Sequence, residues 1–160
     1  MKKSHLLALI LLFLPALALV SCSDDNDLPK VGITVDFKNP VVNDTVYAVA
    51  GDSLVVNGVT VKNLENDKAV ALTQVSYYID GFYLGTAVIP PYDASVLVPE
   101  GTRVGRHILE LTAPVLMVDK APADAVLGFY LKVVESEDDI PDEANPSTLS
   151  GTASYSDVKK

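Results

Sequence analysis

The dipeptide Asp80-Gly81 is the feature that most constrains the fold of this 160-residue chain, because it separates two β-rich runs. The first run is Val75–Ile79 and the second is Phe82–Thr86. Asp-Gly is strongly favoured in the two-residue type I′ turn, where both central residues need positive φ. The sequence therefore predicts a β-hairpin. Its expected cross-strand pairs are Ile79 with Phe82, Tyr78 with Tyr83, and Tyr77 with Leu84.

Opposed residues of a hairpin share a face of the sheet, so the predicted register assigns each side chain to a side. One apolar face is expected to point into the core: Val75, Tyr77, Ile79, Phe82 and Leu84. The other face carries Ser76, Tyr78, Tyr83 and Gly85. Tyr78 and Tyr83 form a possible binding face, since a tyrosine offers an apolar body with a polar tip. Alternatively, the pair only stabilises the hairpin or is covered by a neighbouring segment.

The region 31–135 is rich in Val, Ile, Leu and Tyr and is divided by Gly, Asp and Pro. Its short alternating segments are typical of an all-β sandwich. The first segment alternates from Val31 to Phe37 and is expected to end at Asn39-Pro40. Further strands are expected at 45–50, 53–61, 95–98, 107–112 and 127–134, with irregular chain at 114–124. Residues 136–160 are acidic and then Ser/Thr-rich, which predicts a disordered C-terminal tail.

The N-terminal segment has the layout of an export signal. Lys2 and Lys3 precede an apolar run from Leu6 to Val20, and Cys22, the only cysteine, follows. The run is shorter than the roughly 20 residues that a membrane-spanning helix needs. Residues 1–21 resemble the signal peptide of bacterial lipoproteins, with a lipobox cleaved before Cys22. That resemblance implies lipidation of Cys22 and stable anchoring in outer-membrane lipid through its acyl chains. An ordinary signal peptide or a short membrane anchor is the alternative.

The residues after the cysteine refine the expected location. Ser23, Asp24, Asp25, Asn26 and Asp27 resemble the acidic tag that sends some Gram-negative lipoproteins to the cell surface. Residues 22–30 are accordingly interpreted as a lipidated acidic tether of a surface-exposed outer-membrane protein. The alternative is a plain solvated acidic tether, which would leave the protein on the periplasmic leaflet.

The charge balance and the cysteine count restrict the partners and the core. The chain has a net charge of −9, and cleavage before Cys22 would leave 10 basic and 21 acidic residues, a net charge of −11. Such an acidic protein repels phosphate backbones, so nucleic-acid binding is disfavoured. With its only cysteine lipidated, the domain has no disulfide and depends on apolar burial.

A series of short motifs, in order along the chain, resembles the immunoglobulin-like modules of bacterial surface proteins. The motifs are Gly51–Val56, Tyr77–Gly81, Leu84–Thr86, Pro90-Pro91-Tyr92 and Gly105–Leu109. The resemblance implies an all-β, Ig-like antiparallel sandwich of about seven strands over residues 31–135. Unlike antibody domains, the chain has no tryptophan and no inter-sheet disulfide, so Tyr77 and aliphatic residues are expected to fill that space.

The implied function is that of a non-catalytic, lipid-anchored surface lipoprotein for adhesion or accessory binding, with a possible protein or glycan ligand. The alternative is a periplasm-facing outer-membrane assembly or structural lipoprotein.

Candidate catalytic and metal-binding residues are weak. Gly51–Leu54 spells the signature of the GDSL esterases, whose serine nucleophile needs a nearby base. His107 is the only histidine after residue 21, and Val104 stands where that family has an aspartate. His107 lacks a second histidine for a zinc site, and the acidic clusters lack the spacing of a calcium loop. No catalytic residue, metal or cofactor is therefore predicted.

Overall fold

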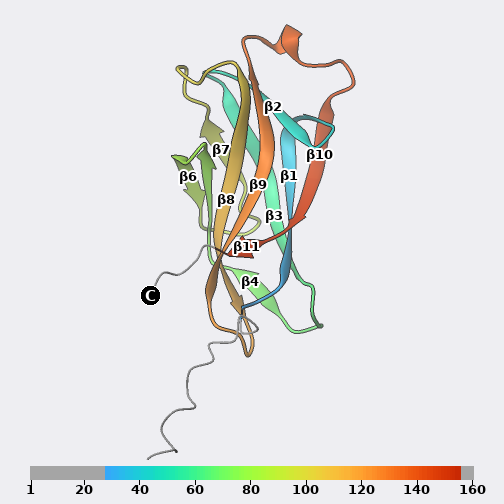
Figure 1. The fold of residues 1–160 in the computed structure, drawn as a ribbon, viewed down its shortest axis with the longest axis vertical. Coiled ribbons are helices and arrows are strands. Elements are labelled where there is room, and N and C mark those ends of the chain that lie inside the picture. Colours follow the sequence, from blue (N-terminus) through green and yellow to red (C-terminus); the bar gives the residue numbers. More distant parts are fainter. Residues whose placement is uncertain (1–27, 156–160) are drawn as a thin grey trace, which may run out of the picture.

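The computed structural model describes residues 28–155, which form a β-sandwich (Figure 1). Within these residues, eleven strands pair into one continuous ladder, in the order β6-β5-β8-β9-β2-β1-β3-β7, with β10 beside β1, β11 beside β9 and β4 beside β8. The strands are β1 (Val31–Val42), β2 (Thr45–Val49), β3 (Ser53–Asn63), β4 (Val70–Leu72), β5 (Val75–Ile79), β6 (Phe82–Ala87), β7 (Ala94–Leu97), β8 (Gly105–Met117), β9 (Ala123–Val134), β10 (Asn145–Thr152) and β11 (Ser154–Tyr155).

The ladder folds back on itself at the β1–β2 hairpin, so that two layers face each other. One layer contains β10, β1, β3 and β7, and the other contains β6, β5, β8 and β9. The chain crosses between the layers in Greek-key fashion, because β7 returns to pair with β3 while β8 returns to pair with β5. This crossing is the arrangement of Ig-like sandwiches. The all-β, Ig-like sandwich predicted from the sequence is confirmed, but the predicted count of about seven strands over residues 31–135 is wrong, because the described chain has eleven strands and two of them lie beyond residue 135.

One strand pair departs from the antiparallel expectation, since β2 runs parallel to β9. The β1–β2 turn at Asn43 and Asp44 has positive φ at both residues, 48° and 57°. The tight reversal keeps the start of β2 paired with the end of β1 and places β2 along the free edge of β9, so β2 links the two layers. The first strand also does not end at Asn39-Pro40, as the sequence predicted. It continues through a bulge, where the Asn39 side chain accepts a hydrogen bond from the Val55 amide at 2.6 Å.

The core lies between the layers and is closed by apolar contacts. The rings of Phe37 and Phe129 meet edge to face, with centroids 5.6 Å apart. Tyr77 is the largest fully buried side chain, as the absence of tryptophan predicted. Its hydroxyl donates to the carbonyl of Tyr92 at 2.9 Å, and the Tyr92 hydroxyl donates to the carbonyl of Leu72. Both buried hydroxyls are thereby satisfied, which burial in an apolar core requires.

The predicted hairpin is present, and Asp80 and Gly81 have φ of 49° and 80°. Two of the three predicted pairs are correct: Ile79 lies opposite Phe82, and Tyr78 lies opposite Tyr83. The third is wrong, because a bulge places Gly85 opposite Tyr77 and leaves Leu84 as the extra residue.

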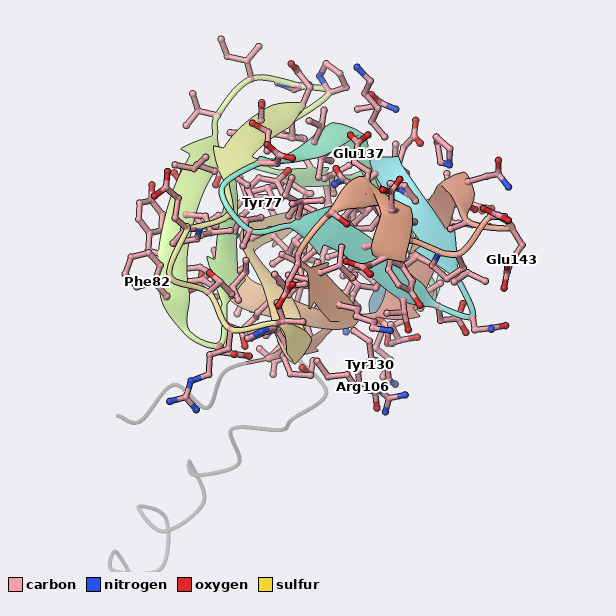
Figure 2. The ribbon with its side chains drawn as sticks, turned by 90° about the horizontal axis from the view of Figure 1, so that it is seen from above. Tyr77, Phe82, Arg106, Tyr130, Glu137 and Glu143 are labelled. Carbon is pink, nitrogen blue, oxygen red and sulfur yellow. The ribbon has the colours of Figure 1, made fainter. Side chains whose placement is uncertain are left out.

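The assignment of Phe82 to the core is also wrong, since its side chain is 63% exposed. Phe82 lies at the tip of β6, the edge strand of its sheet, and it points outward at the periphery of the molecule (Figure 2). A shallow hollow of about 290 Å³ lies between Phe82, Ile79 and Pro99. The opposite layer therefore does not cover the hairpin tip.

The prediction of a disordered tail over residues 136–160 is wrong for its described part. Strand β10 pairs with β1 along most of its length, from Asn145 opposite Val41 to Thr152 opposite Gly32, and β11 pairs with β9. Because β10 is an edge strand, most of its side chains are exposed, and Leu149 alone is buried. A polar composition in such a strand is indistinguishable from that of a disordered segment. The acidic segment Glu137–Asp139 forms a single 3-10 turn.

The structure also extends β8 and β9 into residues 114–124, where irregular chain was expected, and adds the unpredicted strand β4.

Cys22 and the segment Ser23 to Asp27 lie outside the described residues, so the lipidation and export-tag predictions remain predictions. Within residues 28–155, no helix is long and apolar enough to span a membrane.

Candidate functional site: an outward sheet face

The outward side of the β6-β5-β8-β9 sheet carries a continuous set of aromatic, aliphatic and charged side chains, here called the outer face. Strand pairing places Tyr83, Tyr78, Glu110 and Gly128 in one row across the sheet. Ile108 and Tyr130 form the next row, and Arg106 and Lys132 the one beyond. The outer face is therefore built on four hydrogen-bonded strands, and a rigid sheet fixes the spacing of its side chains.

The two tyrosines predicted from the sequence meet at one edge of this face. The Tyr78 and Tyr83 rings pack edge to face, with centroids 5.6 Å apart and planes at 62°. The Tyr83 hydroxyl lies 2.9 Å from Oγ1 of Thr86, which in turn lies 2.8 Å from Oγ of the buried Ser76. These contacts hold the Tyr83 ring in place, although more than half of its surface is exposed. A fixed, exposed aromatic ring loses little freedom when a ligand covers it.

The outer face is hollowed at its β9 side, beside Gly128. A hollow of about 420 Å³ is lined there by Ile108, Gly128 and Tyr130 and extends to Leu149 and Gly151 of β10, in the other layer. Tyr130 is 57% exposed, and Ile108 is exposed as well. Figure 2 shows Tyr130 pointing outward, away from the buried Tyr77. A concave apolar surface with an aromatic wall suits a protruding ligand group.

Charged groups border the apolar centre. Nζ of Lys132 lies 5.5 Å from the ring centroid of Tyr47 on β2, a cation–π contact that positions its charge. Arg106 is the neighbour of Lys132 in the ladder and points outward on the same side as Tyr130 (Figure 2). Glu110 lies between Tyr78 and Gly128. The outer face thus combines an apolar centre with both signs of charge.

His107 has a structural place beside this face. Its Nδ1 lies 2.6 Å from Oδ2 of Asp80, and its Nε2 lies 2.7 Å from the carbonyl oxygen of Arg103. The Ile108 amide donates to the other Asp80 oxygen at 2.8 Å. This arrangement ties the β5–β6 turn to the start of β8 and so fixes the position of Ile108.

Both members of this pair have shifted pKa values. Partial burial of the His107 ring lowers its pKa, but the bonds to Asp80 and Arg103 and the Asp80 charge outweigh burial, so the pKa of His107 is raised. The hydrogen bonds from Ile108 and His107 lower the pKa of Asp80. The charged pair is therefore favoured in weakly acidic solution.

The esterase and metal hypotheses gain no support from the geometry. Ser53 lies exposed at the start of β3, opposite Leu97 of β7, while His107 is engaged by Asp80 and Arg103. Across residues 28–155, no group of three or more His, Cys, Asp or Glu side chains is placed to hold a metal ion.

No family model and no curated protein matches this sequence. Among solved structures, the chain is similar to the fibronectin(III)-like modules of Clostridium thermocellum CbhA. The identity is 18%, the alignment covers 64% of this chain and 97% of that chain, and the TM-score is 0.39. Nothing about function is transferred at this level of similarity, so the outer face is interpreted from its own geometry.

Ile108, Glu110 and Tyr130 were not singled out from the sequence. The signal that could have found them is the alternation along the later strands: Leu109 and Leu111 are buried, so their neighbours in β8 point to the other face. Which outward residues become neighbours depends on the β8–β9 register, which no short turn motif specifies.

Proposed function

We propose that this chain is a non-catalytic, lipid-anchored binding module of the cell surface, and that its outer face docks a protein partner. The observation that carries the proposal is the exposed group Tyr83, Ile108 and Tyr130 on the outer face, of which Ile108 and Tyr130 line the hollow beside Gly128. Exposed aromatic and aliphatic side chains gathered on a rigid sheet are typical of interaction surfaces. Tyrosine and arginine are the residue types enriched at protein interfaces.

A protein partner is favoured over a glycan for two reasons. The centre of the face includes Ile108, an aliphatic side chain that offers no stacking surface to a sugar ring. Arg106, Lys132 and Glu110 border that centre as charges do at the rim of a protein interface. A glycan ligand is the second outcome that the binding experiment below distinguishes.

The anchoring half of the proposal rests on Cys22, which follows the lipobox-like leader. Cys22→Ala is expected to release the protein from the membrane fraction, whereas the wild type remains after a salt wash. Protease treatment of whole cells should remove the wild-type domain if the acidic tag directs it to the surface. A Cys22→Ala variant that stays with washed membranes contradicts the lipid anchor, and full protection from protease contradicts surface exposure.

The binding half is tested with arrays of extracellular matrix proteins and of glycans. The double variant Tyr83→Ser/Tyr130→Ser should lose binding that the wild type shows on the protein array. Ile89→Ser is the matched control, because Ile89 is also highly exposed but lies in the loop between β6 and β7, off the outer face. Equal loss in both variants, or binding on the glycan array only, contradicts the proposed protein partner.

A further inference from the structure

The end of the sandwich at which the described chain begins carries exposed aliphatic side chains. This tether end consists of residues 28–32, 62–70 and 116–122, which pairing brings together: β1 begins opposite the end of β3, and β4 lies opposite the end of β8. Leu64 and Leu116 are exposed here, and Val118 is 56% exposed. A shallow hollow of about 370 Å³ lies between Ala69–Ala71 and Leu116–Val118.

The length of the tether limits how far this end can be from a membrane. This step rests on the proposed lipidation of Cys22. Leu28 follows Cys22 by six residues. A fully extended chain covers at most about 3.6 Å per residue, so Leu28 lies within about 20 Å of the acylated cysteine. The opposite end is farther away, because β8 has 13 residues and so spans roughly 40 Å.

The distribution of charge also favours the tether end, and not the opposite end, as the part of the domain nearer a membrane. In the tether end, four lysines offset three carboxylates, and ion pairs join Lys30 and Lys120 to Glu65. Residues 135–143, which follow β9 at the opposite end, hold six acidic residues, all exposed, and no basic one. Figure 1 shows the loop between β9 and β10 at the top and β4 at the lower end. An anionic bilayer surface therefore repels the far end much more than the tether end.

We infer that the tether end is a bilayer-docking surface, with Leu64, Leu116 and Val118 placed at the boundary between headgroups and acyl chains. Exposed aliphatic residues bind this boundary, and lysine stems can extend from it to keep their charges in water. The sandwich then stands upright on the membrane. The outer face, whose rows from Arg106 to Glu110 lie in the half of β8 away from the tether end, remains open to a partner approaching from the side.

A pair of matched cysteine variants tests this orientation. Val118 and Val104 flank β8 at its two ends, and their exposures are 56% and 54%. Since Cys22 is the only native cysteine, each substitution, Val118→Cys or Val104→Cys, gives one free thiol in the lipidated protein. Each is labelled with an environment-sensitive fluorophore and reconstituted into phosphatidylethanolamine–phosphatidylglycerol vesicles that contain a spin-labelled quencher lipid.

The label at Val118 should show a blue-shifted emission and strong quenching by the spin-labelled lipid, and the label at Val104 should show neither. Adding Leu64→Ser and Leu116→Ser to the Val118→Cys variant should reduce the quenching while flotation with the vesicles is retained. Flotation with equal quenching at the two positions overturns the docking surface alone. Protein that does not float with the vesicles overturns the lipid anchor and the docking surface together.

Discussion

Removing the Tyr77 hydroxyl tests how the core is held without a disulfide or a tryptophan. In Tyr77→Phe the ring that fills the centre of the sandwich remains, but the carbonyl of Tyr92 loses its donor at 2.9 Å. A lost hydrogen bond that leaves a buried acceptor unpaired costs about 1–2 kcal/mol. For a domain of this size the loss corresponds to a fall in Tm of roughly 4–8 °C.

The assay is urea unfolding followed by circular dichroism, with Tyr130→Phe as the control. Tyr130 is exposed on the outer face, so its hydroxyl should contribute less than about 0.5 kcal/mol. Burial, with the charge of Asp93, also raises the pKa of Tyr77, so the hydroxyl stays protonated throughout the neutral range. If Tyr77→Phe is as stable as the control, the buried hydrogen bond to the Tyr92 carbonyl does not stabilise the core.

Three further perturbations address the turn, the C-terminal strand and the ion pair. Gly81→Val should destabilise the domain by roughly 1 kcal/mol or more. Gly81 has φ of 80°, and an added Cβ would meet no other atom, so the cost is backbone strain. An unchanged urea midpoint would contradict this expectation. Leu149→Ser should lower the urea midpoint and raise hydrogen exchange in β10, since Leu149 is its one buried side chain; unaltered exchange would mean that β10 does not depend on the core. The raised pKa of His107 stabilises the folded domain fully below pH 6.5, the ordinary pKa of histidine, and this stability is lost as pH rises through the pKa of His107 in the folded protein. The lowered pKa of Asp80 stabilises the folded domain above pH 3.8, the ordinary pKa of aspartate, and this stability is lost as pH falls through the pKa of Asp80 in the folded protein. Tm should therefore decline above pH 6.5 in the wild type and do so less in His107→Gln, and equal slopes would exclude His107 as the cause.

The parts of the fold that local chemistry dictates were predictable from the sequence. Asp80-Gly81 specifies its own turn, because few other dipeptides accept positive φ at both positions. Alternation assigned Tyr77 to the core, and its place as the largest buried side chain follows from the absence of tryptophan.

Structural features that depend on contacts between residues far apart in the sequence were not predictable. The bulge at Leu84 and the exposure of Phe82 depend on how the hairpin packs against the rest of the sandwich, which no local motif specifies. Strand β10 has the polar composition of a tail and becomes a strand only because β1 offers it a free edge.

The candidate site also has a part that local sequence predicts and a part that depends on long-range strand pairing. Tyr78 and Tyr83 were found because a turn fixes their pairing, and they do lie together on the outward side. Ile108 and Tyr130 are separated by a loop that contains no register signal, and only the β8–β9 ladder makes them neighbours. Their role in binding remains a prediction.

Site-specific photo-crosslinking in living cells measures directly whether the outer face contacts a partner protein on the cell surface. A photoreactive phenylalanine analogue is placed at Tyr130 in one strain and at the highly exposed Ile89, off the outer face, in another. We expect a discrete higher-mass protein adduct after irradiation from position 130 and none from position 89. An adduct from position 89 with none from position 130 would contradict the assignment of the outer face as the binding surface.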